Sequence, residues 1–544
     1  MKPSLLSVFA LGSFFVLAGC SGGTAEEASV ADNRIASVDR PLPEGAPLRM
    51  ADHGDGTFTN PPLWGDFPDP SIIRVDNTFF FATTTFANVP ALTILESKDL
   101  VNWQYTAHLI DRLEGDGAYD LEDGGAYRKG IFAPSLRYHE GTYYLAVTPV
   151  GLNTRIYYTD DIRGDWQYHE LDREAFDPAL FFDDDGTFYL ATSLGYDGTV
   201  TLLVLSDDGS EVIKSDEIYY NEGAEGTKIL KRNGYYYMFH SIPRRLGMTV
   251  SRARDFYGPW ETVDQIDDTT GGHQGAIVDL PDGTDYGFVM VDAGAIGRMT
   301  NISPMHWVDD WPVWGTPDAP GQVPAKADKP IKGHKAEMPA TSDDFAAEHL
   351  GLQWQWNHNP VRENWSLTER PGHLRLKPLA AEGFWTARNT LTQKSWGPFS
   401  RGEVKLDISS LTEGDHCGFG MIGKYSAYIS VDGGDKGQHT LSMTVSEDTT
   451  DGQVLDRRAE GINAAANHLY LRTDMDFETD RGQAAYSFDA ENWTVLGGDF
   501  PLAFDWQTGT FQGEQFAIFC YADGPSAGHL DVDAFQLSGR PPAP

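Results

Sequence analysis

Basic residues and cysteines are scarce in this chain, and long apolar runs are almost absent. Its 544 residues carry 41 Lys and Arg against 80 Asp and Glu, which gives a formal net charge of −39. A surface this negative repels nucleic-acid phosphates and lacks the polybasic patch that binds anionic lipid headgroups. The three cysteines form no CxxC pair, and no HExxH occurs. These absences exclude a general nucleic-acid binder and leave a zinc site without support.

The one marked apolar run, Leu5 to Ala18, is too short for a membrane-spanning helix and is typical of a signal peptide. It ends in Leu-Ala-Gly followed by Cys20, which resembles the bacterial lipobox. That resemblance implies cleavage before Cys20 and lipidation of its sulfur, whereas the alternative is an ordinary secretory signal. Ser21 is compatible with sorting to the outer membrane. We expect an exported bacterial lipoprotein with a signal peptide at 1–19, a flexible tether at 20–50, and no other membrane contact.

The remaining sequence predicts an all-β protein of two domains. Hydrophobic residues make up 40% and aromatic residues 12%, with 57 glycines, which favours strands joined by many turns. No amphipathic pattern of four helical turns is present. The segment from Thr316 to Ser342 holds five prolines and four lysines without apolar periodicity, so we interpret 316–342 as a linker. It separates a first domain at 51–315 from a second at 343–544.

The first domain repeats one plan five times: a polar or small residue, two spacers, an apolar pair, a turn and an aromatic strand. The five units begin at Asp69-Pro70-Ser71-Ile72-Ile73, Ala133-Pro134-Ser135-Leu136, Asp177-Pro178-Ala179-Leu180-Phe181, Glu225-Gly226-Thr227-Lys228-Ile229 and His273-Gln274-Gly275-Ala276-Ile277. Their starts are spaced by 64, 44, 48 and 48 residues, each about the length of a four-stranded propeller blade. The repeat therefore predicts a five-bladed β-propeller.

The first residues of the units are expected to converge, because the innermost strand of each blade lines the central channel. They are Asp69, Ala133, Asp177, Glu225 and His273. Aspartate before proline often caps a turn, which is a structural explanation for two of the five but not for the others. Clustered carboxylates split their pKa values, so that one serves as an acid and another as a base. Glycosidic bond cleavage needs this division, and a separation of about 6.5–9.5 Å predicts inversion.

Several stretches, in order along residues 55–315, carry a family resemblance. They are Trp64-Gly65-Asp66-Phe67-Pro68-Asp69-Pro70-Ser71-Ile72-Ile73, Ser97-Lys98-Asp99-Leu100-Val101-Asn102-Trp103, Asp177-Pro178-Ala179-Leu180-Phe181-Phe182, Glu225-Gly226, Asn233-Gly234-Tyr235-Tyr236-Tyr237, Gly272-His273-Gln274-Gly275, Gly297-Arg298 and Trp307-Val308-Asp309-Asp310-Trp311-Pro312-Val313. Together they resemble glycoside hydrolase family 43. The resemblance implies that Asp69 is the general base, Asp177 the carboxylate that tunes the acid, and Glu225 the general acid. It also implies that Arg298 lies near the sugar.

The acid motif departs from the family pattern, which is often Glu-Gly-Pro-His where this chain has Glu225-Gly226-Thr227-Lys228. Glu222 is a competing acid and Asp66 a competing base. The distance to the Tyr235 strand favours Glu225, and the repeat alignment selects Asp69. His273 resembles a histidine that helps to hold hydrated calcium near the propeller axis in many relatives. No cofactor is expected to be required, and Ca²⁺ at His273 is left open because calcium prefers oxygen ligands.

Trp64 and Phe67 are candidates for sugar stacking, with blade core as the alternative, and His273 is a further candidate contact. The second domain has a non-repeating strand pattern that favours a β-sandwich. Its stretches Gly351-Leu352-Gln353-Trp354-Gln355-Trp356-Asn357-His358-Asn359-Pro360 and Trp385-Thr386-Ala387-Arg388-Asn389-Thr390-Leu391 resemble the concanavalin-like jelly roll that follows some family 43 propellers. Such a domain packs on the propeller and can contribute to the site rim, or it binds sugar independently. Whether Cys417 and Cys520 pair is open.

The resemblance implies an inverting exo-glycosidase that removes terminal β-D-xylose or α-L-arabinofuranose from plant or algal polysaccharide fragments. The two sugars place similar hydroxyls in similar positions, so the sequence does not choose between them. The alternatives are a non-catalytic glycan-binding lipoprotein and a structural propeller scaffold. Intact Asp69, Asp177 and Glu225 favour the enzyme. The expected partner is an oligosaccharide or polysaccharide.

Overall fold

The computed structural model describes residues 37–122, 124–193, 197–266, 272–434, 438–464 and 466–541. The predicted signal peptide and Cys20 lie outside the described residues. Within them, no helix combines the length and the hydropathy that crossing a bilayer demands. The helices that the structure describes are single 3₁₀ turns: η1 (Gly117–Asp120), η3 (Pro243–Arg245), η4 (Gly294–Ile296), η5 (Arg362–Asn364) and η6 (Phe384–Thr386). The expectation of an all-β chain is confirmed.

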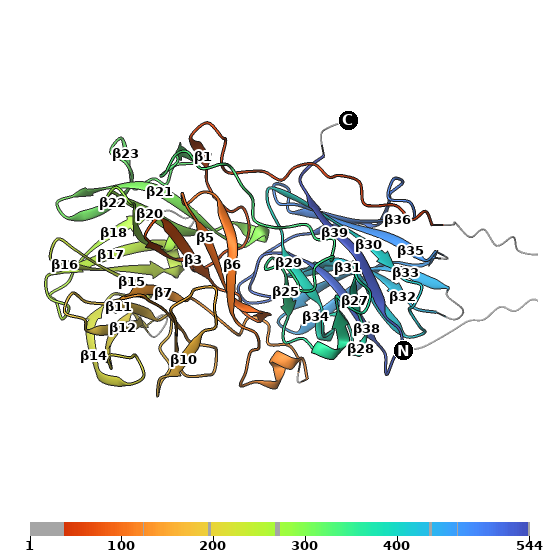
Figure 1. Ribbon diagram of the computed structural model, residues 1–544, viewed down its shortest axis with the longest axis horizontal. Coiled ribbons are helices and arrows are strands. Elements are labelled where there is room, and N and C mark those ends of the chain that lie inside the picture. Colours follow the sequence, from red (N-terminus) through yellow and green to blue (C-terminus); the bar gives the residue numbers. More distant parts are fainter. Residues whose placement is uncertain are drawn as a thin grey trace, which may run out of the picture. The chain divides into compact units, whose positions relative to one another are not determined.

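The first domain is a five-bladed β-propeller, as the repeat predicted (Figure 1). From the inner strand outward, the first two blades are β2 (Ser71–Val75), β3 (Thr78–Thr83), β5 (Ala91–Ser97), β6 (Trp103–Ile110), and β7 (Ser135–His139), β8 (Thr142–Val147), β9 (Arg155–Thr159), β10 (Gln167–Glu170). The third and fourth blades are β11 (Ala179–Phe182), β12 (Phe188–Ser193), β13 (Thr199–Leu205), β14 (Val212–Tyr220), and β15 (Glu225–Arg232), β16 (Tyr235–Ile242), β17 (Gly247–Ala253), β18 (Glu261–Ile266). The fifth blade is β19 (His273–Asp279), β20 (Asp285–Asp292), β21 (Arg298–Val308), β22 (Trp311–Thr316) and β23 (Ala319–Pro320).

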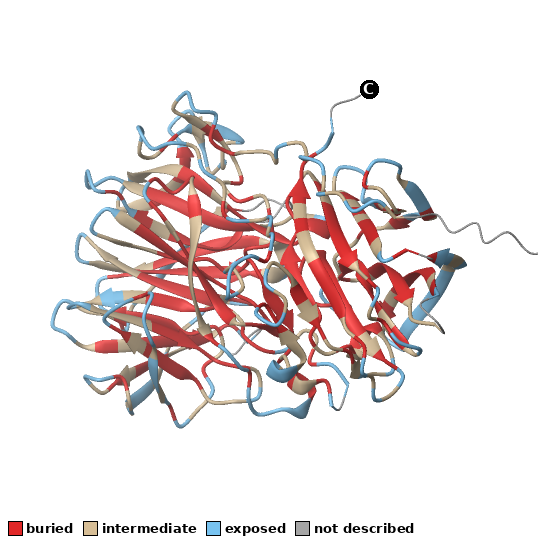
Figure 2. Cartoon of the chain, turned by 45° about the vertical axis from the view of Figure 1, so that its right-hand side comes forward, coloured by how far each residue is buried: buried red, intermediate tan, exposed pale blue. Residues whose placement is uncertain are grey.

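The inner strands β2, β7, β11, β15 and β19 contact one another around the axis. The first residue of each repeat unit therefore lies at the start of an inner strand, either at its first position or two residues before it. The aromatic strand that follows in each unit is the second strand of the blade. Its side chains pack between blades, as Phe80 of the first blade does against Tyr143 of the second, with ring centroids 5.6 Å apart. Figure 2 shows buried residues along the middle of the blade strands and exposed residues in the loops.

The second domain is a β-sandwich of two sheets, and it agrees with the concanavalin-like expectation. The first sheet has the order β34 (Gly452–Ala464), β33 (His439–Thr449), β32 (Tyr425–Asp432), β31 (Asp415–Ile422), β38 (Gln515–Ala522), β29 (Leu391–Lys394), β25 (Gln355–Asn357), β4 (Asn88–Val89), with β28 (Leu379–Ala380) beside β38. The second sheet has the order β26 (Trp365–Ser366), β27 (Leu374–Leu376), β39 (Leu530–Ser538), β30 (Phe399–Asp407), β35 (His468–Asp476), β36 (Arg481–Ser487), β37 (Thr494–Pro501). Because β4 belongs to the first blade's segment, the sandwich sheet continues into the propeller.

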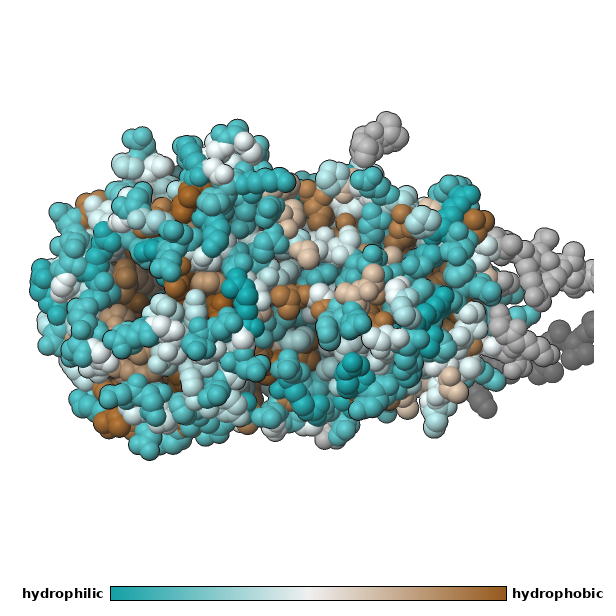
Figure 3. Space-filling view, in the orientation of Figure 1, coloured by the Kyte–Doolittle hydropathy of each residue, from teal (hydrophilic) through white to brown (hydrophobic). Residues whose placement is uncertain are grey.

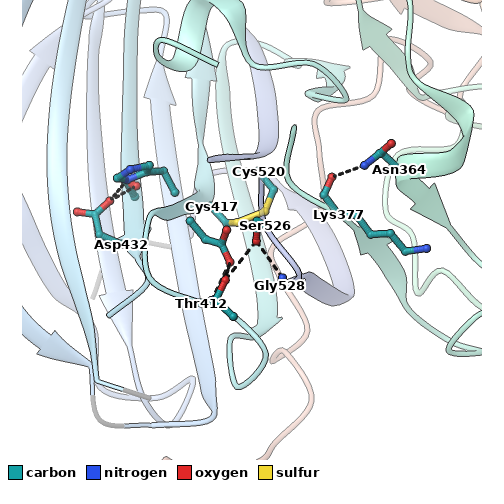
Figure 4. Close-up of a disulfide and its surroundings, with 11 residues drawn as sticks. Asn364, Lys377, Thr412, Cys417, Asp432, Cys520, Ser526 and Gly528 are labelled. Atoms are coloured by element: carbon teal, nitrogen blue, oxygen red, sulfur yellow. Dashed lines mark hydrogen bonds and ion pairs between the residues drawn. A yellow bond between two sulfur atoms is a disulfide. The ribbon is translucent and has the colours of Figure 1, made fainter. Parts of the chain in front are cut away.

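Cys417 and Cys520 form a disulfide, a pairing that the sequence left open (Figure 4). They lie directly opposite each other on the neighbouring strands β31 and β38, and both are buried. Figure 4 also shows Ser526 nearby, whose hydroxyl lies 3.2 Å from the hydroxyl of Thr412 and accepts a hydrogen bond from the Gly528 amide. The disulfide therefore ties two central strands of one sandwich sheet.

The segments that flank the propeller are held by specific contacts. In the described part of the predicted tether, the Tyr470 hydroxyl donates to the Arg40 carbonyl at 2.6 Å, and the Gly539 amide donates to the Ala46 carbonyl at 2.8 Å. In the predicted linker, β24 (Lys326–Asp328) pairs with β1 (Thr57–Thr59). Buried Lys329 follows β24 and forms ion pairs with Asp52 and Asp99.

The acidic residues are spread over both domains, and most are solvated. The face shown in Figure 3 is mainly hydrophilic, with apolar side chains confined to small areas. A high charge of this kind supports solubility and says little about chemistry. The few buried carboxylates are therefore the informative ones.

Candidate active site

The predicted carboxylates meet in one of two adjoining cavities, of about 610 and 550 Å³. The first cavity is lined by Asp69, Asp177 and Glu225 and by residues of both domains: Phe86, Arg128, Phe132, Phe176, Gln274, Arg298, Trp506, Gln507 and Phe511. The second is lined by Glu225, Pro243, Arg244, Leu246, His273, Asp292, Arg298, Phe504, Trp506 and Phe511. Because the two share Glu225, Arg298, Trp506 and Phe511, a ligand that fills both passes directly beside Glu225.

Asp69 lies just before β2 and is 6% exposed. Its φ of +54° is left-handed, a conformation that aspartate tolerates better than most residues, and it turns the chain into the inner strand. Thr84 donates a hydrogen bond from its hydroxyl to Asp69 Oδ2 at 2.6 Å. An Arg298 guanidinium nitrogen lies 3.9 Å from Oδ1. Both contacts suit an ionised carboxylate.

Asp177 occupies the equivalent position before β11, with a φ of +45° and 8% exposure. Gln274 donates from Nε2 to Asp177 Oδ2 at 3.2 Å. Burial, and then the charge of Asp69, raise the pKa of Asp177 to about 7, against the opposing effects of Lys228, Gln274 and Arg298. This carboxyl therefore changes its charge near neutral pH.

Glu225 is the first residue of β15 and borders both cavities. Burial raises its pKa to about 8, and the negative charges of Asp177 and Asp69 add to the rise. At neutral pH Glu225 is thus mostly protonated and able to donate a proton. The competing Glu222 is exposed and lines neither cavity.

Arg298 begins β21 and is buried between the domains. Its main-chain amide donates to Asp66 Oδ1 at 2.7 Å, and its guanidinium lies 5.0 Å from the ring centre of Phe86. The other oxygen of Asp66 accepts from the Gly513 amide at 3.2 Å. Asp66 therefore joins the two domains at the edge of the site, and it is Asp69 that lines the cavity.

His273 begins β19 and lines the second cavity. Its Nδ1 lies 3.1 Å from the Ser241 hydroxyl, and its Nε2 lies 3.4 Å from Asp292 Oδ1. Calcium takes six to eight oxygen ligands. Across the described residues no three His, Cys, Asp or Glu side chains are grouped to hold a metal ion. The oxygen-bearing side chains that contact His273 are one carboxylate and one hydroxyl, fewer oxygen ligands than calcium takes.

Comparison with known proteins decides the family. Residues 58–312 match the family model described as Glycosyl hydrolases family 43, and residues 342–538 match the β-xylosidase C-terminal concanavalin A-like domain. A relative from Xylanibacter ruminicola is 32% identical over 479 residues, which cover 83% of this chain and 85% of the relative. The chain belongs to glycoside hydrolase family 43.

Other relatives of this family 43 enzyme carry two different activity names. A β-xylosidase of Formosa agariphila is 29% identical, with 89% of this chain and 90% of the relative covered. A non-reducing end α-L-arabinofuranosidase of Bacteroides ovatus is 30% identical, with 60% and 65% covered. Among solved structures, a bifunctional family 43 protein of Bacteroides eggerthii superposes with a TM-score of 0.82 at 32% identity. That superposition covers 92% of this chain but only 64% of the larger protein.

The structure does not bring Trp64 and Phe67 to either cavity of the enzyme. Phe67 is fully buried, with its ring 5.9 Å from Trp396 of the sandwich. Trp64 lies beneath the Arg49 guanidinium at 3.9 Å and against Gly397, where a Cβ would come within 2.3 Å of its ring. Both aromatics therefore pack the junction between the domains, although their place in the sequence suggested sugar stacking.

A sandwich loop supplies cavity residues that the sequence did not point to. The loop at 502–514 carries Phe504, Trp506, Gln507 and Phe511, and Trp506 is 61% exposed. Asp448 accepts a hydrogen bond from the Gly509 amide at 2.6 Å and lies 3.5 Å from Arg128 of the propeller. No repeat unit contains this loop. The one sequence feature that marks it is Trp506, a tryptophan late in the chain. Gln274 could have been proposed from the sequence, because it follows His273 in the Gly-His-Gln-Gly stretch.

Proposed function

We propose that this glycoside hydrolase removes terminal β-D-xylose or α-L-arabinofuranose from plant or algal polysaccharide fragments, with inversion of the anomeric carbon. Asp69 acts as the general base that activates water, and Glu225 acts as the general acid that protonates the leaving oxygen. Asp177 tunes Glu225, and Arg298 binds the sugar beside Asp69. The observation that carries the proposal is that Glu225, with its pKa raised to about 8, shares one cavity with Asp69, whose contacts suit the ionised form.

The two domains together support attack at a chain end. Phe511 and Trp506 of the sandwich border the same cavity as the propeller carboxylates. A terminal sugar in the first cavity leaves the adjoining second cavity for the group to which it is linked. Relatives named as a β-xylosidase and as an α-L-arabinofuranosidase support a pentose, and either sugar fits the proposal.

The test compares hydrolysis of nitrophenyl β-xyloside and nitrophenyl α-arabinofuranoside by wild type, Asp69→Asn and Glu225→Gln. We expect kcat to fall by ~10²- to 10⁴-fold in each variant, as for the loss of a general acid or base. Glu222→Gln, an exposed control three residues from Glu225, is expected to keep full activity. Proton NMR of the first-formed anomer tests inversion. Full activity in Glu225→Gln overturns the acid assignment, and glycan binding without turnover in wild type favours a lectin.

We also propose that the enzyme is exported as a lipoprotein, with its anchor at Cys20 and its folded domains at the outer membrane. The lipobox-like Leu-Ala-Gly-Cys and the Cys417–Cys520 disulfide, which suits an oxidising compartment, support this location. Labelled palmitate is expected to be incorporated by the wild type and not by Cys20→Ala. Equal labelling of both would contradict the anchor.

A further inference from the structure

Lys228, one of the two residues at which this chain departs from the family's acid motif, connects to the carboxylate cluster through one intermediary. It lies on β15 three residues after Glu225 and is 9% exposed. Its Nζ donates to Gln274 Oε1 at 2.8 Å, and Gln274 Nε2 donates in turn to Asp177 Oδ2. The three residues belong to three blades: Asp177 precedes β11 of the third, Lys228 is on β15 of the fourth, and Gln274 is on β19 of the fifth. Gln274 lines the cavity and Lys228 does not, so Lys228 acts from behind Gln274.

The ammonium group of Lys228 decides which way the Gln274 amide points. A lysine ammonium donates hydrogen bonds and accepts none, so the amide oxygen must face it. The amide nitrogen is then left to face Asp177. The opposite orientation would place the amide oxygen against the carboxylate oxygen and the amide nitrogen against the ammonium, which are two repulsive contacts. Without a cation at 228, this preference is lost.

The backbone leaves space for this arrangement at one glycine. Gly226 has a φ of +59°, and a Cβ at this position would lie 2.2 Å from Gln274 Nε2. The pairing of β15 with β16 shifts between Glu225 and Lys228, and the pairing of β19 with β20 shifts between His273 and Ala276. These irregularities let the Gln274 side chain pass over β15 toward Asp177.

The charge of Lys228 also bears on the carboxylates. Burial lowers the pKa of Lys228 to about 8, while Asp69 and Asp177 oppose that fall and Arg137 adds to it. Its positive charge in turn lowers the pKa of Asp177. Burial, and then the charges of Asp177 and Asp69, raise the pKa of Glu225, whereas Lys228 is not among the causes of that shift. Lys228 therefore affects Asp177 more than the acid.

We propose that Lys228 is a positioning residue that orients the Gln274 amide toward Asp177, beside Glu225. The inference rests on the proposed roles of Asp177 and Glu225. It concerns how the site is held rather than which sugar the site accepts. Lys228 touches neither cavity, so its substitution affects turnover more than binding.

The kinetic test replaces Lys228 with Met, which keeps the length of the side chain and removes the charge. We expect kcat to fall ~10- to 100-fold, as for other residues that orient a ligating or reacting group, with KM within ~threefold of wild type. The acidic limb of the pH profile of kcat/KM is expected to move up by ~0.5–1 unit, because Asp177 loses a positive neighbour. The alkaline limb, set by Glu225, is expected to stay. Lys228→Arg is expected to restore part of kcat.

A double-mutant cycle and a matched control separate this role from a loss of folding. Gln274→Leu is expected to reproduce the effect of Lys228→Met, and the double variant is expected to be no worse than either. Lys405→Met removes a similarly buried lysine of the sandwich, paired with Asp39 and Asp533, and is expected to keep the wild-type pH profile. Additive losses, or a wild-type acidic limb in Lys228→Met, overturn the inference.

A readout without substrate keeps this test distinct from the test of the proposed function. In crystal structures, Gln274 is expected to donate to Asp177 in wild type and to turn away or lose that contact in Lys228→Met. If the Gln274 amide keeps its orientation and its contact with Asp177 in Lys228→Met, the inference is overturned even if pentosides are hydrolysed. If wild type hydrolyses no pentoside, the proposed function fails, and the amide orientation still decides the role of Lys228.

Discussion

Arg298 of the propeller and Phe511 of the sandwich contact each other at the edge of the carboxylate cavity. The Arg298 guanidinium donates to the Phe511 carbonyl at 3.3 Å and lies 4.8 Å from the centre of the Phe511 ring. The same guanidinium is 3.9 Å from Asp69. Because one side chain contacts both the proposed base and the second domain, the site is complete only when the sandwich is in place.

Phe511→Ala is therefore expected to impair catalysis although the substitution lies in the accessory domain. It removes the ring beside Arg298, and a cation–π contact of this kind contributes ~0.5–2 kcal/mol. We expect kcat/KM to fall ~3- to 30-fold, measured by steady-state kinetics on the hydrolysed nitrophenyl pentoside. Val495→Ala, at an exposed position of the same domain, is the control. Unchanged kinetics in Phe511→Ala would show that Arg298 is held without the ring.

The pH dependence of catalysis is expected to report on Glu225. A general acid must be protonated, and its pKa is raised to about 8. The protonated fraction falls as pH rises through 8, so kcat/KM is expected to decline on the alkaline side near that value. Glu225→Gln is expected to lose this alkaline limb. The variant is also expected to lose less activity on a dinitrophenyl glycoside, whose leaving group needs little protonation. An equal loss on both substrates would count against the acid role.

Trp506→Ala is expected to weaken binding of the group that follows the terminal sugar. The side chain is 61% exposed and borders both cavities, which makes it a flat surface for a sugar ring. Loss of ~1–1.5 kcal/mol of stacking corresponds to a KM ~5- to 10-fold higher for a disaccharide or longer oligosaccharide, with kcat little changed. Tyr220→Ala, equally exposed on the outer strand of the third blade, is the matched control. A similar rise in KM for both variants would contradict a specific role.

Glu514→Gln is expected to stabilise the enzyme at neutral and alkaline pH. Glu514 lies fully buried at the end of the loop that carries Phe511, and it accepts from the Ala503 amide at 3.2 Å. Burial raises its pKa well above 4.5, so the folded state holds a proton that the unfolded state releases above 4.5. The free energy of unfolding therefore falls as pH rises from that value toward the folded pKa.

Glutamine keeps the acceptor and removes this titration. The gain in Tm, measured by calorimetry, is expected to be larger at pH 8 than at pH 5. Glu222→Gln at an exposed position is expected to show no such difference. A gain independent of pH would mean that Glu514 is ionised in the folded enzyme.

The five blades and the carboxylate cluster could be predicted from the sequence because a repeat records local structure. Each unit has its own inner strand, and the rule that inner strands face one axis places Asp69, Asp177 and Glu225 together. The repeat alignment separated Asp69 from Asp66, and the distance to the Tyr235 strand separated Glu225 from Glu222. The sequence by itself thus determined the fold of the propeller and the carboxylates at its centre.

Only the tertiary structure decided what surrounds that cluster. Trp64 and Phe67 precede Asp69 closely, yet they pack against the sandwich, because packing between segments more than 300 residues apart is not encoded in a local pattern. The contacts of Phe511 and Trp506 with the propeller site have the same origin. Pairing of Cys417 with Cys520 depended on the register of β31 against β38. Interactions within a strand and its turn can be predicted from adjacent residues, whereas contacts between domains depend on how two completed surfaces fit.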